Sequence, residues 1–445
     1  MNTKIRLRDR LSSFQIIILG FAGVILLGAL ILMLPISSQN GAVTPLDKTL
    51  FTSTSAVCVT GLVVVDTASY WSYFGQAVIL ILIQIGGLGV ITVASLLLML
   101  AGRKISLMQR QTMQNALSAP QLGGMVKLTR FILVVTFSTE IMGAIMLMPT
   151  FISQFGKRGI WMAFFHSISA FCNAGFDLMG SEFGKYSSLT AYANNEYVSV
   201  VICLLIVVGG MGFSTWNDIR TKKTHIKEYR MQTKVILVTT AILIIVPTLF
   251  FFLVDFAGKP IGERICMSFF QAITPRTAGF NTADLNQLSG AGRSIMMILM
   301  LIGGSPGSTA GGIKTTTLAV LLANAISVFK KRESANYYGR RIDDSVVKNA
   351  STIFFLYVFF GLIAAFIISI TDKLPIHTCM FESFSAIGTV GLTLGITPSL
   401  SNVSQIILML LMFFGRVGGL TIIYAAFSSR DTSTSKYPME NIIVG

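Results

Sequence analysis

The chain has 445 residues, of which 53% are hydrophobic and only 12% are charged. Soluble domains carry about 25% charged residues, so this composition excludes a water-soluble enzyme or binding domain and predicts a membrane protein. The formal net charge of +15 does not indicate nucleic-acid binding, because the basic residues stand in short segments between apolar runs and form no basic face interleaved with aromatic residues.

The apolar runs are long enough to cross a hydrocarbon layer, which takes about 20 residues per helix. The first two runs are 14–35 and 76–100, and the last is 406–427. The first run lacks a small-residue cleavage site and further spans follow it, so we interpret it as a span and not as a signal peptide.

Five basic segments separate the apolar runs and predict the topology. They lie at 4–10, 103–130, 220–234 and 330–341, with the sparser pair Arg430 and Lys436 as the fifth. The positive-inside rule assigns all five to the cytoplasm. Both termini are therefore expected inside, and the chain must leave and return four times.

Each of the four excursions contains an eleven-residue segment of one pattern. The segments align without gaps, begin with Phe and end with Gly, and they occupy 51–61, 165–175, 269–279 and 381–391. They are too short to cross and stand on the outer side, so we predict re-entrant pore helices. The backbone after each must be buried in protein or line a water-filled cavity.

A second landmark, a glycine pair, follows each segment: Gly86-Gly87, Gly209-Gly210, Gly303-Gly304, and Gly418-Gly419 with Gly415 nearby. The second repeat has about ten extra residues, which we assign to an extracellular loop at 180–196. The predicted fold is an all-α polytopic membrane protein. Four pseudo-symmetric repeats, each an outer span, a pore helix with its loop and an inner span, surround a central pore. The expected repeats are 1–100, 101–217, 218–330 and 331–430, with a cytoplasmic tail at 431–445.

The end of each eleven-residue segment is a candidate cation site. Removing the water from a cation requires a ring of backbone carbonyls at one depth, and glycine permits the positive φ angles that turn the carbonyls inward. The fourth copy matches the first half of the TVGYG potassium filter, but no copy keeps its second glycine, so a short filter is expected. The alternative, that the glycines only allow close helix packing, explains four copies in register less well. The predicted filter residues are Val59, Thr60 and Gly61; Asn173, Ala174 and Gly175; Thr277, Ala278 and Gly279; and Thr389, Val390 and Gly391.

The third inner span is interrupted at 303–312 by glycines, small polar residues and Pro306, which cannot continue a lipid-facing helix. The other three inner spans show no such interruption. A simple kink or a cytoplasmic turn is the alternative, but apolar residues flank the stretch on both sides. A phosphate-binding loop is excluded, because Ile313 breaks the GxxxxGK[ST] spacing and no strand precedes it.

Several charges lie inside apolar segments. Arg416 lies deep in the last span, where a charge costs about 2.5 to 3.5 kcal/mol, so it is expected to face the aqueous path instead of snorkelling to an interface. For Glu140 we favour a structural role over a pairing partner within the bundle. Arg276 and Glu382 are candidates for an ion pair that braces the loops. Outside two filter strands, Asp66 and Asp177 are expected to raise the cation concentration at the mouth.

The four loops, with GGSPGSTAGGIKTTT at 303–317 and FFGRVGG at 413–419, resemble the Trk/Ktr/HKT superfamily of potassium transporters. The length and four-repeat plan resemble the Ktr membrane subunit, KtrB, over the entire chain. The resemblance implies potassium uptake through one pore per subunit. Serine at the first filter position accompanies sodium selectivity in plant relatives, so Gly61 favours potassium.

The resemblance also implies an intramembrane gating loop at 303–314 that lies across the pore below the filter. Arg416 would act with it as a fixed positive charge that hinders cations, and loop movement would relieve the barrier. The implied gate residues are Gly303, Gly304, Ser305, Pro306, Gly307, Ser308, Thr309, Ala310, Gly311, Gly312, Lys314 and Arg416.

Partners are implied by the resemblance as well. They are a second copy of the chain and a cytosolic octameric ring of nucleotide-binding RCK subunits, KtrA, in the bacterial plasma membrane. The nucleotide would be bound by the ring, and this chain would bind no cofactor beyond potassium as substrate and sodium as a modulator. The basic loops and the tail from Ser428 are candidate contact surfaces for the ring or for anionic lipid.

Two other function classes fit less well. An alternating-access symporter predicts inverted repeats and midplane carboxylates, whereas these repeats run parallel. A membrane-embedded enzyme would need a catalytic set, and HExxH and a plausible Ser/His/Asp set are absent. The five cysteines have no metal-binding spacing, so no metal other than potassium at the filter is expected.

Overall fold

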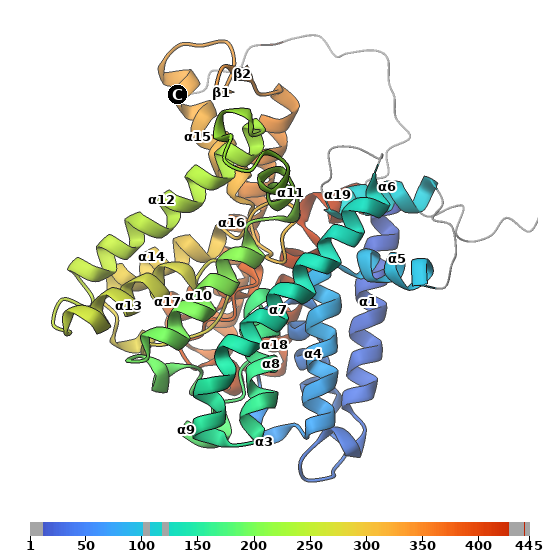
Figure 1. The fold of residues 1–445 in the computed structure, drawn as a ribbon, viewed down its shortest axis with the longest axis vertical. Coiled ribbons are helices and arrows are strands. Elements are labelled where there is room, and N and C mark those ends of the chain that lie inside the picture. The colour runs from blue at the N-terminus through green and yellow to red at the C-terminus, as the bar shows by residue number, and fades with distance from the viewer. Residues whose placement is uncertain (1–11, 101–106, 118–123, 427–439, 441–445) are drawn as a thin grey trace, which may run out of the picture.

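The computed structural model describes residues 12–100, 107–117, 124–426 and 440, and most of them are helical (Figure 1). A two-stranded antiparallel hairpin, β1 (Asn336–Tyr337) and β2 (Arg340–Arg341), is the sheet within these ranges. The basic segment 4–10, part of the segment 103–130, and the tail 431–445 apart from Glu440 lie outside the described residues.

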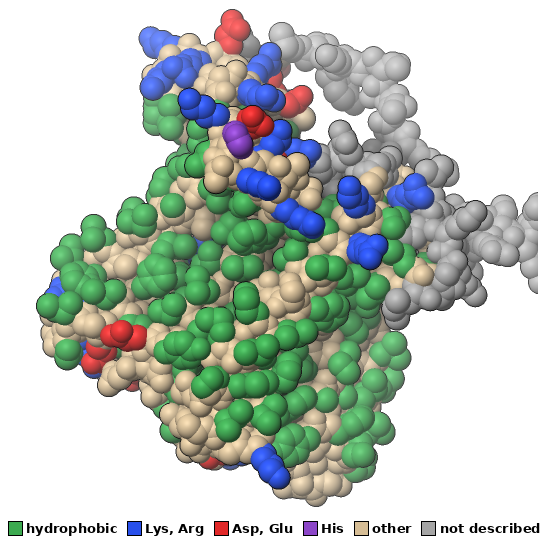
Figure 2. All heavy atoms as spheres, in the orientation of Figure 1, with side chains coloured by type: hydrophobic (Ala, Val, Ile, Leu, Met, Phe, Trp, Pro, Cys, Tyr) green, Lys and Arg blue, Asp and Glu red, His purple; other side chains and the backbone are tan. Residues whose placement is uncertain are grey.

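Four long helices form the outer spans, as the apolar runs predict. They are α1 (Ser13–Leu32), α7 (Met125–Phe155), α12 (Met231–Leu253) and α16 (Asp344–Asp372). Their apolar windows are only 22 to 33% buried within the protein, so most of their hydrophobic surface faces outward. Figure 2 shows this surface covered by hydrophobic side chains. A capping box starts α1, in which the Ser12 hydroxyl accepts from the Gln15 amide and the Gln15 side chain accepts from the Ser12 amide.

The four eleven-residue segments form short helices, which confirms the helical part of that prediction. The helices are α2 (Leu46–Cys58), α8 (Arg158–Phe171), α13 (Ile261–Ile273) and α17 (Ile376–Gly388). At 1.5 Å per residue each is about 20 Å long and cannot cross a bilayer. Each packs against the outer span that precedes it in the chain.

The inner spans are broken in all four repeats. In three repeats a helix pair is bent sharply: α4 (Tyr73–Leu88) and α5 (Val90–Leu100) by 98°, α10 (Glu196–Gly210) and α11 (Phe213–Lys222) by 93°, and α18 (Asn402–Val417) and α19 (Gly419–Ala426) by 92°. In the third, a loop at 302–314 separates α14 (Gly290–Leu301) from α15 (Thr315–Phe329).

The expectation that only the third inner span is interrupted is therefore wrong. The bends occur at Gly89, Gly212 and Gly418, whose φ angles are +85°, +88° and +92°. Only glycine adopts this conformation without strain. The apolar runs continue through Gly89 and Gly418, so hydropathy conceals those two bends, whereas at Gly212 the apolar run gives way to the more polar helix α11.

In three repeats a landmark glycine of the inner span, Gly86, Gly209 or Gly415, lies against the end of the pore helix. A Cβ atom on Gly86 would lie 2.1 Å from the Val57 carbonyl oxygen, and one on Gly415 would lie 2.1 Å from that of Ile387. The second sequence landmark is thus a close helix approach that tolerates no side chain.

The repeats pack in a closed cycle. Each inner helix contacts the pore helix of the next repeat: α4 with α8, α10 with α13, α14 with α17, and α18 with α2. The last contact joins the fourth repeat to the first, so the four repeats surround a common axis.

The molecule has two distinct ends along the spans. One carries α3 (Thr67–Tyr70) and α9 (Gly180–Phe183), and we name it the mouth end (Figure 1). The other carries α6 (Leu107–Leu117), α11 and the β1–β2 hairpin, and we name it the basic end. Lys and Arg side chains gather there (Figure 2). Short helical turns complete the connections: η2 (Pro35–Ser37), η3 (Thr190–Tyr192), η4 (Ile226–Glu228), η5 (Leu285–Gln287) and η6 (Thr397–Ser399).

Candidate functional site

The glycines that end the four predicted filter strands meet at one place. A Cβ atom on Gly61 would lie 2.5 Å from the Ala174 carbonyl oxygen and 3.1 Å from Gly175 Cα. One on Gly175 would lie 3.0 Å from Gly279 Cα, and one on Gly279 would lie 3.3 Å from Gly391 Cα. One on Gly391 would lie 3.0 Å from Gly61 Cα, which closes the cycle. We call these four residues the glycine ring.

The backbone carbonyl before each glycine also approaches the ring. The Thr60 carbonyl oxygen would lie 2.1 Å from a Cβ on Gly391, and the Val390 oxygen 2.3 Å from one on Gly279. Any side chain at these glycines would collide with the backbone of a neighbouring repeat. Glycine at all four positions lets the ring close without displacing these carbonyls, at a spacing that brings carbonyl groups of all four repeats together.

The first residue of each filter triplet has an unusual backbone conformation. Val59, Asn173, Thr277 and Thr389 have φ angles of 57°, 59°, 68° and 52°. Such left-handed angles cost about 1 to 3 kcal/mol for residues other than glycine and persist where the surrounding structure imposes them. Three of the four are β-branched, the least tolerant class. The same left-handed conformation thus begins every predicted filter triplet.

Backbone hydrogen bonds fix this turn in each repeat. The amides of Thr60, Ala174 and Val390 each donate, over 2.8 Å, to the carbonyl oxygen five residues earlier. In the third repeat the Ala278 amide donates to the Thr274 carbonyl oxygen over 3.0 Å. The strands are therefore held by their own pore helices.

Hydroxyl groups on the pore helices also hold the filter strands, and the sequence prediction missed them. The Ser55 and Ser385 hydroxyls accept from the amides of Gly61 and Gly391, both over 3.1 Å. Ser169 and Thr274 instead donate to the carbonyl oxygens just beyond the second and third glycines. A serine at the fifth place of three of the four aligned segments was the signal that could have revealed them.

The second place of two of the aligned eleven-residue segments carries a buried ionisable side chain. His166 accepts from the Leu178 amide at Nε2 (3.3 Å), while its Nδ1 contacts the Met162 carbonyl oxygen (2.7 Å). The Glu382 carboxylate accepts from the Thr397 hydroxyl. Both side chains attach the segment after the filter to the pore helix. The ion pairs among the described residues do not include the expected one between Arg276 and Glu382.

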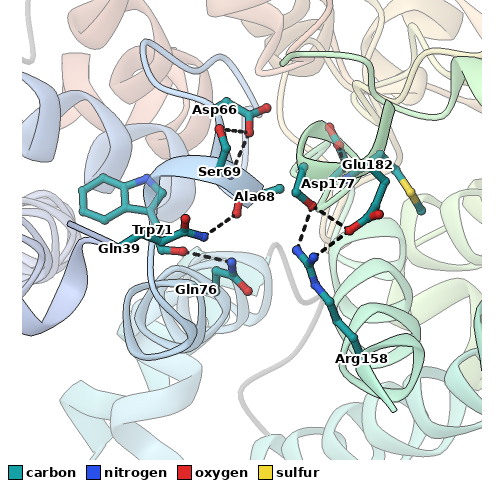
Figure 3. Close-up of polar contacts among 11 residues, drawn as sticks. Gln39, Asp66, Ala68, Ser69, Trp71, Gln76, Arg158, Asp177 and Glu182 are labelled. Atoms are coloured by element: carbon teal, nitrogen blue, oxygen red, sulfur yellow. Dashed lines mark hydrogen bonds and ion pairs between the residues drawn. The ribbon is translucent and has the colours of Figure 1, made fainter. Parts of the chain in front are cut away.

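At the mouth end the glycine ring opens into a cavity of about 290 Å³. Asp66 and Asp177 both line it, together with Asn281 and Asp284. The Asp66 carboxylate accepts from the Ser69 amide and hydroxyl (2.8 and 2.7 Å, Figure 3) and from the Tyr186 amide (3.0 Å). Asp66 therefore ties the extra loop of the second repeat to the first repeat.

A second set of contacts anchors that loop from its other side. The Arg158 guanidinium, at the start of the second pore helix, pairs with the Glu182 carboxylate over 2.7 Å (Figure 3). The Ser188 hydroxyl accepts from the Asn281 amide over 3.0 Å. The loop thus bridges three repeats over the mouth.

On the other side of the ring, the interrupted segment of the third repeat lies against the second repeat. The Ser305 amide donates to the Gly210 carbonyl oxygen (2.9 Å), and the Phe213 amide donates to that of Gly307 (2.9 Å). The Thr309 hydroxyl donates to the Phe171 carbonyl oxygen at the end of the second pore helix (3.0 Å).

The same segment closes on itself and touches the predicted filter. The Gly303 amide donates to the Ile313 carbonyl oxygen (2.8 Å), and the Lys314 ammonium donates to that of Ala310 (2.7 Å). A Cβ atom on Gly311 would lie 2.1 Å from the Thr389 hydroxyl oxygen. The segment is therefore a hairpin-like loop directly beneath the filter triplets.

Arg416 holds this loop from the opposite side. It stands in the last turn of α18, just before the bend, and not in the middle of a straight span as expected. Its guanidinium donates to the carbonyl oxygens of Thr309, Gly86 and Gly87, the last over 3.1 Å. It also lines a cavity of about 190 Å³ with Lys314 and residues of the loop. The side chain points inward, which argues against snorkelling.

Glu140 lies behind the second pore helix. Its carboxylate, in a side chain that is 3% exposed, accepts from the Gln84 amide over 3.3 Å. Its backbone carbonyl accepts from the Ser167 hydroxyl over 2.6 Å. Glu140 thus links the first inner helix, the second outer span and the second pore helix, away from the ring.

Comparison with known proteins identifies the family to which this architecture belongs. The family model TrkH, described as a cation transport protein, matches residues 3–435. The chain belongs to the TrkH family. It is 40% identical to the potassium/sodium uptake protein NtpJ of Enterococcus hirae over 99% of both chains. It is 36% identical to the Ktr system potassium uptake protein B of Bacillus subtilis, over 97% of this chain and 96% of that one.

A solved structure supports the TrkH-family fold. The crystal structure of the potassium transporter TrkH from Vibrio parahaemolyticus superposes with a TM-score of 0.74 at 17% identity. The match covers 95% of this chain and 86% of that one. The cyclic arrangement of four repeats is therefore that of the TrkH fold, which confirms the predicted fold class.

Proposed function

We propose that this TrkH-family chain is the ion-conducting subunit of a Ktr-type potassium uptake system, and that potassium passes through a filter at the glycine ring. The observation that carries the proposal is the approach of the four glycines to one another at the ends of four pore helices. Peptide oxygens gathered at one depth replace the hydration shell of a cation. The carboxyl ends of the pore helices also carry partial negative charge toward the ring.

The names of the relatives support potassium as the substrate. One is a potassium/sodium uptake protein and another a potassium uptake protein, so sodium acts as a modulator or a second substrate in this proposal. The parallel repeats around one axis favour a pore over an alternating-access symporter, which uses inverted repeats. The activity is transport, and the chain itself holds no cofactor or metal besides its cargo.

The loop at 303–314 and Arg416 form the gate in this proposal. A fixed positive charge about 4 Å from a cation opposes it by about 4 kcal/mol at an effective dielectric constant near 20. The bonds from Arg416 to Thr309 and Gly87 keep that charge beneath the filter while the loop is in place. Displacing the loop would free the guanidinium to move aside.

The basic end faces the cytoplasm of the bacterial plasma membrane in this proposal, in accordance with the positive-inside rule. The relatives are named as parts of a Ktr system, which supports regulation by a separate subunit. We assign that role to a cytosolic octameric RCK ring that binds the nucleotide and carries a homodimer of this chain.

The filter is tested by rubidium flux into proteoliposomes. Gly391→Ser places a side chain against the Thr60 carbonyl, so we expect the preference for potassium over sodium to fall about tenfold, which corresponds to 1.4 kcal/mol. Gly290→Ser is the matched control, because the space beside Gly290 is open. An unchanged ion preference in Gly391→Ser would refute the filter assignment.

A further inference from the structure

A groove at the basic end is not used by the proposed pore. It has a volume of about 910 Å³ and lies between the first turns of α7 and the helix α11. Five basic side chains and two acidic ones line it. The basic residues are Lys127, Arg130, Arg220, Lys222 and Arg230, and the acidic ones are Asp218 and Glu228.

The two acidic groups are already engaged. Glu228 pairs with Lys222 over 3.1 Å. The buried Asp218 carboxylate accepts from the Arg230 amide (2.9 Å) and from the Thr233 hydroxyl (2.8 Å). The side chains of Lys127, Arg130, Arg220 and Arg230 are exposed and form no ion pair with the described residues. The groove therefore presents uncompensated positive charge that fits an anion.

The groove lies where a lipid headgroup would be. The helix α11 is bent by 93° from the span α10, so it lies nearly at right angles to that span, as a helix on a membrane surface would. One stripe of α7 changes from basic to apolar along its length: Lys127 and Arg130 are followed at helical spacing by Val134 and Phe137, which are 59% and 45% exposed. A ligand in the groove thus meets basic groups first and lipid-facing surface next.

An aromatic contact joins the two walls. The Arg220 guanidinium of α11 lies 5.5 Å from the centre of the Phe131 ring of α7. This position favours a fixed guanidinium, the group that binds phosphate oxygens with two parallel hydrogen bonds.

We propose that this groove binds an anionic phospholipid, with its phosphate among Arg130, Arg220 and Lys127 and an acyl chain along Val134 and Phe137. Basic pockets at the cytoplasmic ends of spans are suited to such headgroups. A soluble phosphate would use the basic groups but would gain nothing from the apolar stripe. The acidic face of a protein would not explain why the stripe continues into the membrane.

Native mass spectrometry of the full chain, titrated with phosphatidylglycerol or phosphatidylcholine, tests the site. For the double variant Arg130→Gln/Arg220→Gln we expect phosphatidylglycerol retention to fall about tenfold, the equivalent of 1.4 kcal/mol, with phosphatidylcholine unaffected. Lys330→Gln/Lys331→Gln removes the same charge from exposed positions outside the groove and should retain the lipid. Arg130→Lys/Arg220→Lys should recover part of the binding.

Equal phosphatidylglycerol retention by the native chain and the double variant would overturn the proposal. So would competition by free glycerol phosphate as effective as that of the intact lipid, because the apolar stripe would then play no part. If the double variant is not monodisperse, Lys127→Gln/Arg230→Gln makes the same test on the two other uncompensated bases.

The groove is connected to the loop at 303–314 through α11. The amide of Phe213, the first residue of α11, donates a hydrogen bond to the Gly307 carbonyl oxygen. A Cβ atom on the preceding residue, Gly212, would lie 2.6 Å from the Pro306 carbonyl oxygen. If the loop is a gate, as the proposed function holds, lipid in the groove should influence rubidium flux.

We therefore expect native flux to depend on the phosphatidylglycerol fraction of the liposomes, and the Arg130→Gln/Arg220→Gln variant to lose this dependence while Lys330→Gln/Lys331→Gln keeps it. If the variant no longer retains phosphatidylglycerol but its flux still depends on the phosphatidylglycerol fraction, the groove does not influence the loop. The proposal that the groove binds the lipid would then still stand. Absence of flux from the native chain would count against the proposed function, whereas the binding result would stand.

Discussion

At the scale of single residues, the glycine ring requires a positive φ angle and space for a neighbouring carbonyl oxygen, and glycine meets both requirements without strain. Gly61 and Gly391 have φ angles of +93°, and a Cβ on either would lie within 2.5 Å of a carbonyl oxygen from a neighbouring repeat. A larger residue would push that carbonyl aside and would not merely narrow the opening. Substitution should therefore alter ion preference before it blocks conduction.

The hydroxyls beneath the ring lead to a second prediction. Ser55→Ala/Ser385→Ala removes the acceptors of the Gly61 and Gly391 amides, each bond being worth about 1 kcal/mol. We expect potassium-over-sodium preference in competitive rubidium flux to fall severalfold with the protein still folded. Ser294→Ala is the control, because the exposed Ser294 hydroxyl bonds only within its own helix. Native selectivity in the double variant would show that these hydroxyls do not position the filter.

Arg416 provides a third prediction at this scale. Arg416→Gln removes the charge but keeps a side chain able to donate hydrogen bonds, so we expect rubidium flux to rise by about tenfold if the barrier falls by 1.4 kcal/mol. Arg340→Gln, at an exposed position in the hairpin, is the matched control. Reduced flux from monodisperse Arg416→Gln protein would contradict a barrier role.

At the scale of elements, the four repeats share one design with one exception. The first residue of every predicted filter triplet has a left-handed backbone conformation, and three inner spans bend at a single glycine. The third repeat replaces the bend with the loop at 303–314, which bonds to the second repeat and to Arg416 of the fourth. In the proposed pore this loop therefore lies beneath the glycine ring, where it would obstruct a passing ion.

Deleting residues 305–311 tests the loop. The deletion removes the bonds of Ser305, Gly307 and Thr309 to the second repeat and frees the space under the ring. We expect faster rubidium flux with little change in ion preference, because the filter triplets remain. A large loss of flux in a deletion protein that stays monodisperse would argue that the loop supports the pore and does not obstruct it.

At the scale of the whole molecule, the closed cycle of helix contacts brings the four predicted filter strands together, and the charge distribution leads us to the proposed orientation. The mouth end carries few basic side chains and the basic end carries many (Figure 2). This asymmetry leads to the proposed orientation, with the mouth outside.

Cysteine labelling tests that orientation. In a chain with the half-buried Cys266 changed to Ser, Lys185→Cys in the mouth-end loop should react with an impermeant maleimide on intact cells. Lys331→Cys at the basic end should react only after permeabilisation; both positions are exposed. The Cys266→Ser parent is the background control. The reverse pattern would invert the topology.

The local features could be predicted from the sequence because each depends on residues close together in the chain. The outer spans follow from uninterrupted apolar runs, and the pore helices and glycine triplets follow from the fourfold repeat. The bends at Gly89 and Gly418 could not, because the chain stays apolar across them, and at Gly212 the loss of hydropathy by itself indicates the end of a span and not a sharp bend. The roles of Ser55 and Ser385 were also missed, since a serine in a buried helix has many partners open to it.

A membrane chain of four parallel repeats, each with a short helix followed closely by a glycine, can be read from the order of the residues. The folded chain was needed to see that the glycines meet, that Arg416 reaches Thr309 and Gly86, and that Lys127 and Arg220 share a groove. These contacts join residues tens to hundreds of positions apart, and they exist only once the helices have packed in their cyclic order.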